Sequence, residues 1–478
     1  MQFCNILKGY VPILKIPLQQ ENIALVVYID ILAKKSYYSL VVILLKGCFL
    51  MLVIKEGLLY FLSMLLQFLI LILAIYFFSI SIVGWIKRKE KPASSFKPTK
   101  KFAMVVAAHN EEIVISELVD SLKNIKYPNE LYDIFVVADN CTDKTADIAQ
   151  DHGAIVLRRF NKIEKGKGFA LEWAFDKIFK MEKKYDAFCI FDADNLVDPR
   201  FLMEMNKRML EGYRVIQGYI DSKNPFDSWI TASYSIAFWT ANRLYQLPRS
   251  YLHMSCGLCG TGFCVDSELI REMGWGATCL TEDLEFTMKL ALRGIYVGWS
   301  HDAIVYDEKP LTLKQSWNQR IRWMQGYADC TGRFFFQLMH KAIKEKNLVA
   351  FDCATYLLQP LRIIVYGIVT ILAYMQFFYP QGGIFQMNYI IPNYVWMVFL
   401  VAQFLYGPLI IMSERRFNLK VLFAYLVYPF YNLTWVPITI VGMLHSDKKE
   451  WSHTAHTRKI NMNEISNNIQ AEAKSSAS

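Results

Sequence analysis

Side chains suited to group-transfer chemistry stand in four short motifs along the middle of the chain. In order, they are Ala138-Asp139-Asn140, Asp192-Ala193-Asp194, Thr281-Glu282-Asp283 and Gln319-Arg320-Ile321-Arg322-Trp323. Carboxylates can bind a metal ion or accept a proton, and arginines can offset the charge of phosphate groups. The motifs therefore indicate chemistry on a phosphate-bearing substrate.

The pair Asp192 and Asp194, separated by one small residue, follows an apolar run. Carboxylates at this spacing can place oxygens on one divalent cation, and Mg²⁺ or Mn²⁺ accepts such ligands while also bridging substrate phosphates. Alone, the pattern is a weak signal and more often marks two loop carboxylates in a turn. Beside the other motifs, it predicts a Mg²⁺ or Mn²⁺ site.

Asp283 is the predicted catalytic base. Thr281 is placed as a helix N-cap, so the Asp283 carboxylate should project from the first turn and reach an acceptor hydroxyl. The alternative is that Glu282, Asp283 and Glu285 only complement the helix dipole. The arginine motif downstream favours catalysis.

Cationic residues and glycines provide further candidate phosphate contacts. Arg322 could offset diphosphate charge, while Trp323, about one helical turn from Gln319, could stack on an acceptor sugar ring. An Arg-Trp pair at a membrane interface is the alternative. The run Lys165-Gly166-Lys167-Gly168 reads either as a loop that approaches phosphate or as a solvated basic turn.

Alternating strands and helices must position these groups. The pattern predicts strands at 102–108, 134–138 and 187–191, with helices at 111–125 and 142–152, the second ending at Gly153. This alternation predicts an α/β domain with a mostly parallel sheet, whose ligands bind at the carboxyl ends of the strands. Glu111, Asp139 and Asp192 all fall just past such ends.

Hydrophobic residues make up 54% of the 478-residue chain, and the mean hydropathy is positive, which indicates membrane segments. The uncharged run 57–86 exceeds the roughly 20 residues that a transmembrane helix needs. Segment 1–56 is a possible additional span or interfacial helix. The net charge of +9 is concentrated partly in 87–101, which favours a basic cytosolic linker over nucleic-acid binding.

The α/β domain is expected over 102–311, followed by an interfacial amphipathic helix at 312–345 that contains the arginine motif. Three transmembrane segments are expected within 350–443, and a polar tail at 444–478. Three further spans would place the basic tail outside, against the positive-inside tendency. Either one span is re-entrant or the tail breaks the rule.

The motifs, in this order from about Val105 to Gly326, resemble those of membrane-embedded family-2 glycosyltransferases, the group of cellulose, chitin, hyaluronan and poly-N-acetylglucosamine synthases. The resemblance implies a GT-A fold and inverting transfer from a UDP-sugar, giving a β linkage. It also implies a multi-pass protein of the cell membrane with its catalytic domain facing the cytoplasm. One departure is Ala108, which stands before His109 where a proline is usual.

The resemblance also assigns roles by position. Nucleotide-sugar contacts are implied for Glu111, Asp139, Lys167, Asp192, Gln319 and Arg322. Metal binding is implied for Asp192 and Asp194, and base catalysis for Asp283. Acceptor contacts are implied for Trp323, Cys259, Gly260 and Thr261, the last three within the small-residue loop 258–262.

The leading hypothesis is a processive polysaccharide synthase that elongates and translocates a β-linked polymer. The alternative enzyme is a non-processive transferase that adds one sugar to a lipid acceptor. Its partners would be a UDP-sugar, a growing polysaccharide or glycolipid, and membrane lipids, without nucleic acid. A non-enzymatic membrane protein is disfavoured, because the acidic motifs are intact and the apolar spans carry few charges.

Overall fold

The computed structural model describes residues 58–86 without 59, 60, 63 and 67, then 88–276, 278–378, 392–414 and 419–447, and 458–467 without 466. The chain divides into two units, Met1–Leu71 with Gln376–Ile390 and Ile72–Met375 with Ile391–Ser478. The α/β region and the motif residues lie in the second unit. The expected N-terminal segment 1–56 lies outside the described residues.

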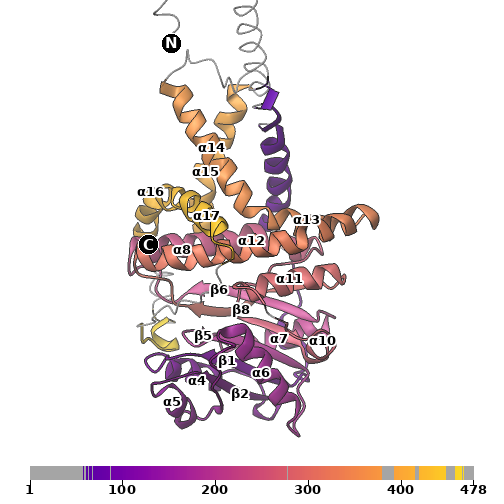
Figure 1. Ribbon diagram of the computed structural model, residues 1–478. Coiled ribbons are helices and arrows are strands. Elements are labelled where there is room, and N and C mark those ends of the chain that lie inside the picture. The colour runs from indigo at the N-terminus through magenta and orange to yellow at the C-terminus, as the bar shows by residue number, and fades with distance from the viewer. Residues whose placement is uncertain are drawn as a thin grey trace, which may run out of the picture. The chain divides into compact units, whose positions relative to one another are not determined.

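An eight-stranded sheet forms the centre of the second unit, with the order β3-β2-β1-β4-β7-β6-β8-β5 (Figure 1). The strands are β1 Phe102–Ala108, β2 Tyr132–Asp139, β3 Ile155–Arg159, β4 Ala187–Asp192, β5 Leu196–Val197, β6 Val215–Ser222, β7 Phe263–Asp266 and β8 Val297–Asp307. Strands β3, β2, β1 and β4 run parallel, as do β6 and β8, whereas β7 is antiparallel to β4 and β6. The predicted strands and the mostly parallel sheet are confirmed.

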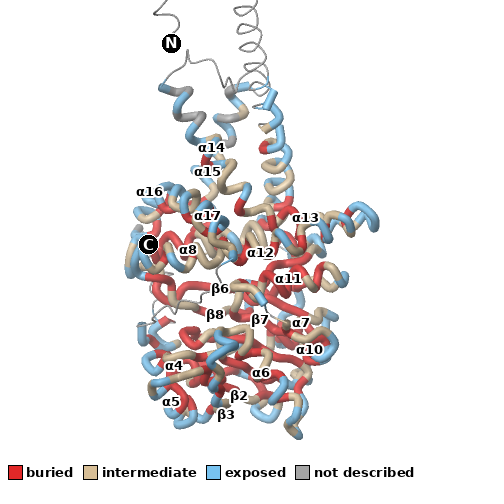
Figure 2. Tube along the Cα trace, viewed as in Figure 1, coloured by how far each residue is buried: buried red, intermediate tan, exposed pale blue. Residues whose placement is uncertain are grey.

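The strands of this sheet consist mostly of buried apolar residues (Figure 2). In β1, Ala103 and Val105 join the core that includes helix α6, whereas Met104 and Val106 join the core that includes α4 and α7. Successive strand side chains point to opposite faces, so an unbroken apolar run fits a strand covered on both sides. These covering helices are α4 Ile115–Lys123, α5 Thr145–Asp151, α6 Lys167–Phe179, α7 Phe201–Leu210 and α10 Ser267–Met273.

The first helix, α4, begins at Ile115 rather than at the predicted position 111. Asn110 has a left-handed φ of 57°, which turns the chain away from a helical path. The Glu111 backbone N–H then donates to Thr145 Oγ1 at 2.8 Å, so these residues form a loop braced against the start of α5. The predicted stop after α5 is confirmed by Gly153 with its φ of 93°.

A layer of helices lies next to β6 and β8 in Figure 1. It contains α8 Trp229–Ala241, the π-helical η4 Asn242–Gln246, α9 Leu247–Tyr251, α11 Glu282–Leu292 and α12 Leu313–Lys344. Helix α12 coincides with the predicted amphipathic segment and starts with a capping box between Thr312 and Gln315. Because α12 packs against α11, α13 and α17, it links the α/β region to the apolar helices.

The apolar helices follow α12 as α13 Leu348–Leu357, α14 Gln359–Phe378, α15 Asn393–Ser413, α16 Leu419–Leu433 and α17 Trp435–Leu444. Among the described residues, Met64–Trp85 and Lys420–Leu444 are long and apolar enough to cross a membrane. The pair Leu348–Leu357 and Gln359–Ile371, bent by 58°, would make a third crossing. The number of spans remains a prediction.

The last apolar stretch both begins and ends beside the α/β region. Near its start, Val421 is buried in the same core as α8 residues. At its end, Gln325 on α12 donates from Nε2 to the His445 carbonyl at 3.0 Å. Farther along, Ile460 and Ile465 in the tail pack with Leu196 and Tyr306 of the sheet. Both ends of this stretch, and the tail beyond it, therefore pack on helices and strands of the second unit.

Candidate functional site

Three of the predicted acidic residues, Glu111, Asp139 and Asp192, lie at or just past the carboxyl ends of neighbouring strands. Asp139 is the last residue of β2, and Asp192 is the last residue of β4. Both strands pair in parallel with β1, which ends three residues before Glu111. Carboxyl ends of neighbouring parallel strands share an edge, so residues far apart in sequence become neighbours.

Lys167 links three of the acidic groups. It opens α6 directly after Gly166, whose φ of 108° suits glycine, and its Nζ forms an ion pair with Asp192 Oδ1. The same Nζ donates to the Gly260 carbonyl at 2.6 Å. Its positive charge also interacts with Glu282 and Asp283. The basic run predicted from sequence therefore reaches the acidic site through this lysine.

Asp283 lies in the first turn of α11, as predicted, and its Oδ1 accepts the Leu284 backbone N–H at 2.8 Å. A Cβ placed on Gly260 would lie 3.6 Å from Asp283 Oδ2, so the small-residue loop is immediately adjacent. Burial, together with the neighbouring Glu282 charge, raises the pKa of Asp283 to about 7. Thr281 occupies the N-cap position, but its side chain makes no capping hydrogen bond.

The loop 258–262 is tied to the Asp192 motif. The Thr261 hydroxyl accepts the Asp192 backbone N–H at 3.0 Å and donates to Asn195 Oδ1. On the other side, the Cys259 N–H donates to Gln217 Oε1 at 2.9 Å. Gly260 has a φ of 81°, which would strain any other residue at this tight turn. The loop therefore presents Cys259 and Gly260 next to the candidate base.

Asp194 lies deeper than Asp192. It is 5% exposed, and its Oδ2 accepts the Glu308 N–H at 3.0 Å. Burial raises the pKa of Asp307, at the end of β8, to about 6, and the charges of Asp194 and Asp192 add to this increase. Sequence reasoning missed Asp307 and Lys309, although they follow an apolar strand just as Asp192 does.

Of the two predicted metal ligands, Asp192 is the accessible one, whereas the buried Asp194 carboxylate accepts hydrogen bonds from Asn195 and Glu308. Across the described ranges, no group of three or more His, Cys, Asp or Glu side chains gathers in a ligating arrangement. Mg²⁺ is ordinarily bound by one or two carboxylates together with substrate phosphates and water, rather than by a full protein cage. The Asp192 carboxylate is 40% exposed, which leaves its oxygens accessible to such a cation.

At the far end of this edge, Asp139 is held by a residue that the sequence reading missed. Arg159 Nη1 donates to Asp139 Oδ1 at 2.7 Å, and both side chains are at least nine-tenths buried. His109 Nδ1 lies 2.7 Å from the Asp139 carbonyl. The signal was an arginine at the end of β3, on the strand beside β2. Glu111 is likewise buried.

The arginine motif on α12 divides between the site and the helix packing. Arg322 lies within electrostatic range of Glu282. Gln319 Oε1 accepts the Tyr234 hydroxyl at 3.0 Å, so this residue is engaged by α8. Trp323 stacks on Trp435 with ring centroids 6.3 Å apart, so one of its faces is already occupied.

Arg320, to which no role was assigned from sequence, is fully buried. Its guanidinium lies 4.4 Å from the Tyr431 ring centroid and 4.9 Å from that of Trp435, and Nη1 donates to Thr434 Oγ1. These cation–π contacts fix the break between α16 and α17 against α12. Arg320 therefore holds Trp435, the residue on which Trp323 stacks.

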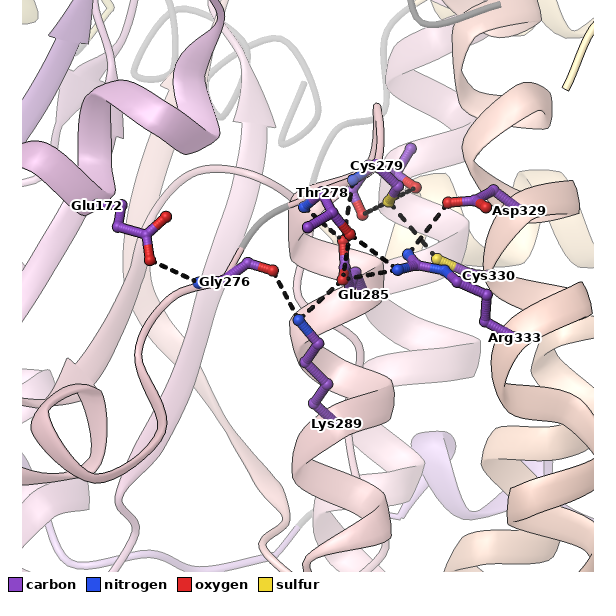
Figure 3. Close-up of polar contacts among 10 residues, drawn as sticks. Glu172, Gly276, Thr278, Cys279, Glu285, Lys289, Asp329, Cys330 and Arg333 are labelled. Atoms are coloured by element: carbon purple, nitrogen blue, oxygen red, sulfur yellow. Dashed lines mark hydrogen bonds and ion pairs between the residues drawn. The ribbon is translucent and has the colours of Figure 1, made fainter. Parts of the chain in front are cut away.

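Glu285 holds the loop before the candidate base (Figure 3). Its carboxylate accepts the N–H groups of Thr278 and Cys279 and pairs with Lys289 at 2.8 Å and Arg333 at 3.0 Å. Burial acts to raise its pKa, but the hydrogen bonds from Arg333 and Lys289 outweigh burial and bring the pKa to about 2. Glu285 is therefore a structural anion that fixes this loop to α11 and α12.

Residues 98–326 match the family model described as glycosyltransferase-like family 2. A probable glycosyltransferase of Bacillus subtilis is 27% identical over 261 residues, 52% of this chain and 61% of that protein. A β-monoglucosyldiacylglycerol synthase of Nostoc is 29% identical over 241 residues, 47% of this chain and 48% of that protein. The chain thus spans about half to three-fifths of these relatives.

A poly-β-1,6-N-acetyl-D-glucosamine synthase of Staphylococcus epidermidis is 23% identical over 330 residues, 66% of this chain and 75% of that protein. Among solved structures, a mannosyltransferase of Pyrobaculum calidifontis in complex with GDP-mannose and Mn²⁺ has a TM-score of 0.52 at 16% identity. The alignment covers 82% of this chain and 97% of that one. At this identity, the likeness concerns the fold, which is the GT-A fold.

Proposed function

We propose that this chain, whose residues 98–326 match the model of glycosyltransferase-like family 2, transfers a sugar from a UDP-sugar to an acceptor hydroxyl with inversion. The observation that carries the proposal is that Lys167 pairs with Asp192 and donates to the carbonyl of Gly260, the residue beside which the Asp283 carboxylate lies. Residues from the ends of β4 and the starts of α6 and α11 thereby face one another. Such an arrangement supplies both diphosphate binding and a base.

In the proposed reaction, Asp283 accepts the proton of the acceptor hydroxyl. The freed oxygen attacks the anomeric carbon from the side opposite the leaving group, and a new carbon–oxygen bond forms there. The bond between that carbon and the diphosphate oxygen breaks, and UDP leaves with the electron pair. One displacement inverts the anomeric centre, so an α-linked donor gives a β-linked product.

The donor would lie along the edge from Asp139 to Arg322. Glu111 and Asp139 are assigned to the uridine, while Lys167 and Arg322 offset the charge of the departing diphosphate. A Mg²⁺ or Mn²⁺ ion held by Asp192 and Asp194, when bound, would neutralise the phosphate oxygens. Gln319 is assigned to the donor side through its position on α12, and its bond to Tyr234 would fix its orientation.

The acceptor would approach over the loop that contains Cys259, Gly260 and Thr261, with Trp323 beside it. Repeated transfer at this position would build a β-linked polymer, the activity proposed first. The second candidate is one transfer to a lipid hydroxyl. It is favoured by the similarity to proteins named β-monoglucosyldiacylglycerol synthase, which covers 47% of this chain.

The proposed location is the cytoplasmic face of a cell membrane, crossed by Met64–Trp85 and by helices after α12. Support comes from the tail contacts: the Arg458 N–H donates to the Glu308 carboxylate, and Ile460 packs with Tyr306. Tail and domain therefore share one side. With the basic residues 87–101 at the same boundary, that side would be cytoplasmic.

The test is UDP release by the purified full chain in detergent, with Mn²⁺ and one UDP-sugar at a time, followed by sizing of the product. A ladder of products supports polymer synthesis, and a single glycolipid supports the second candidate. Asp283→Asn is the negative control. The proposal fails if no UDP-sugar is turned over, or if Asp283→Asn turns over as fast as the wild type.

A further inference from the structure

Arg362 lies in the first turn of α14, just after the 58° bend, and has no acidic partner among the described residues. Its guanidinium carbon lies 4.2 Å from the Phe77 ring centroid. Its Nε is sealed from solvent and has no hydrogen-bond partner within the described part of the chain. By contrast, the nearby Arg249 is neutralised by Asp352 at 2.7 Å.

An uncompensated cation on an apolar helix is costly. Charged groups in such places are normally paired, or they face a cavity or a ligand pathway. Aromatic rings stabilise a guanidinium only in part, since a cation–π contact is weaker than a buried ion pair. The position of Arg362 therefore points to an anionic partner that is not part of the described chain.

Three tyrosines connect this cation to the base. Tyr245 on η4, Tyr327 on α12 and Tyr356 on α13 cluster with ring centroids 4.8 Å apart for Tyr245 and Tyr356 and 5.6 Å apart for Tyr327 and Tyr356. The Arg362 guanidinium lies within electrostatic range of all three hydroxyl groups. Rings with hydroxyl groups suit sugars, because they offer both a flat apolar face and a hydrogen bond.

The same cluster extends to the proposed reaction centre. The Tyr356 hydroxyl lies within electrostatic range of Cys259 and Asp283. A Cβ on Gly257 would lie 3.7 Å from the Tyr356 hydroxyl and 3.8 Å from the Tyr245 ring, so the acceptor loop borders these rings. The π-helical turn η4 also positions Gln246, whose Nε2 donates to the Gly257 carbonyl at 2.8 Å.

We propose that Tyr245, Tyr327, Tyr356 and Arg362 form an acceptor site for an anionic glycan or glycolipid. The sugar ring packs against Tyr327 and Tyr356 with a hydroxyl directed at Asp283, while Tyr245, covered by Arg249 and Tyr356, supports these rings. The phosphate or carboxylate of the acceptor binds Arg362. This inference rests on the proposed transferase activity and adds the charge of the acceptor to it. A transferase that extends a neutral acceptor would not need the positive charge of Arg362.

The experiment compares acceptors in matched pairs, using the full chain in phosphatidylcholine nanodiscs and the UDP-sugar that gives turnover. Diacylglycerol and phosphatidylglycerol form the neutral and anionic lipid pair. Chitotetraose and a hyaluronan tetrasaccharide form the glycan pair. One anionic member should exceed its neutral counterpart by about tenfold or more in kcat/KM, as expected for a charge-assisted hydrogen bond. The pair in which the anionic member is preferred shows whether the acceptor is a lipid or a glycan.

Arg362→Gln should reduce that preference to about one, and Arg362→Lys should retain part of it. Arg271→Gln is the matched control, because Arg271 also lies over a ring, 4.5 Å from Phe179, on the exposed surface of α10. Equal use of neutral and anionic acceptors by the wild type would overturn the inference. So would an Arg362→Gln protein that keeps its preference. Absence of UDP release from every donor would instead refute the transferase proposal.

Discussion

The ammonium group of Lys167 is paired with the carboxylate of Asp192 and also donates to the Gly260 carbonyl. One side chain thus joins the start of α6, the end of β4 and the acceptor loop. Because Asp192 is also a proposed metal ligand, a bound cation must share that carboxylate with the lysine. Lys167 therefore holds Asp192 against the loop 258–262, and we propose that its charge also offsets that of the donor diphosphate.

Lys167→Met should weaken donor binding. The substitution removes a positive charge that faces Asp192, Glu282 and Asp283, so the diphosphate would meet an uncompensated acidic site. We expect the KM for the UDP-sugar to rise by about tenfold or more, measured by UDP release at saturating Mn²⁺. Lys162→Met, at an exposed position in the preceding loop, is the control and should behave as wild type. Unchanged KM in Lys167→Met would contradict the assignment.

Asp283→Asn should abolish transfer while UDP-sugar binding, measured by calorimetry, remains. Loss of a general base typically lowers the rate by about 10² to 10⁴. Asp302→Asn, an exposed aspartate on β8, is the matched control. Asp283→Asn should also be more stable than the wild type at pH 8, with a Tm higher by about 2 °C or more, since it removes a charge that burial disfavours. A lower Tm would argue against the burial cause.

The pH dependence follows from the same group. Because the pKa of Asp283 is about 7, the ionised base is scarce below that value. The kcat/KM should therefore rise about tenfold per unit up to pH 7 and then level off. For stability, the folded state keeps this proton up to about pH 7, whereas an unfolded aspartate loses it near 3.9. The contribution of Asp283 to stability should thus fall as pH rises through this window. For activity, a midpoint near pH 4 would contradict the raised pKa of Asp283.

Much of the sheet was predictable, because β1, β2 and β4 are apolar runs that end in polar motifs. Their neighbouring carboxyl ends then follow from parallel pairing alone. The pairing of Arg159 with Asp139 was not predictable, since it depends on which strand lies beside β2. The same applies to Arg320: its contacts with Tyr431 and Trp435 arise from packing between segments more than 100 residues apart.

Helix starts were less predictable than strands. The Glu111 segment has helical spacing, but Asn110 takes a left-handed φ and the N–H of Glu111 finds Thr145 instead of a helical partner. The path of the last apolar stretch was also not predictable, because hydropathy shows how long an apolar segment is but not whether it crosses the membrane or turns back. Contacts between the tail and the sheet, such as that of Ile460 with Tyr306, depend on tertiary packing that hydropathy does not encode.

Gly326 permits the closest approach between α11 and α12. A Cβ there would lie 2.2 Å from Thr281 Oγ1 and 2.5 Å from its Cγ2, two residues before the base. Thr281 is buried, so its side chain has little room to move. Gly326→Ala should therefore push the two helices apart and cost about 1–3 kcal/mol of unfolding free energy, with a loss of kcat.

Gly332→Ala is the matched control on the same helix, because nothing lies within 4 Å of its Cβ position. Replacing an exposed helical glycine with alanine should stabilise the protein by about 0.5–1 kcal/mol. The two variants share helix propensity and differ only in what the methyl group meets. Thermal unfolding should therefore show a lower stability for Gly326→Ala and a higher stability for Gly332→Ala. UDP release, measured in parallel, should fall only in Gly326→Ala. Equal behaviour of the two variants would mean that Thr281 does not depend on α12 for its position.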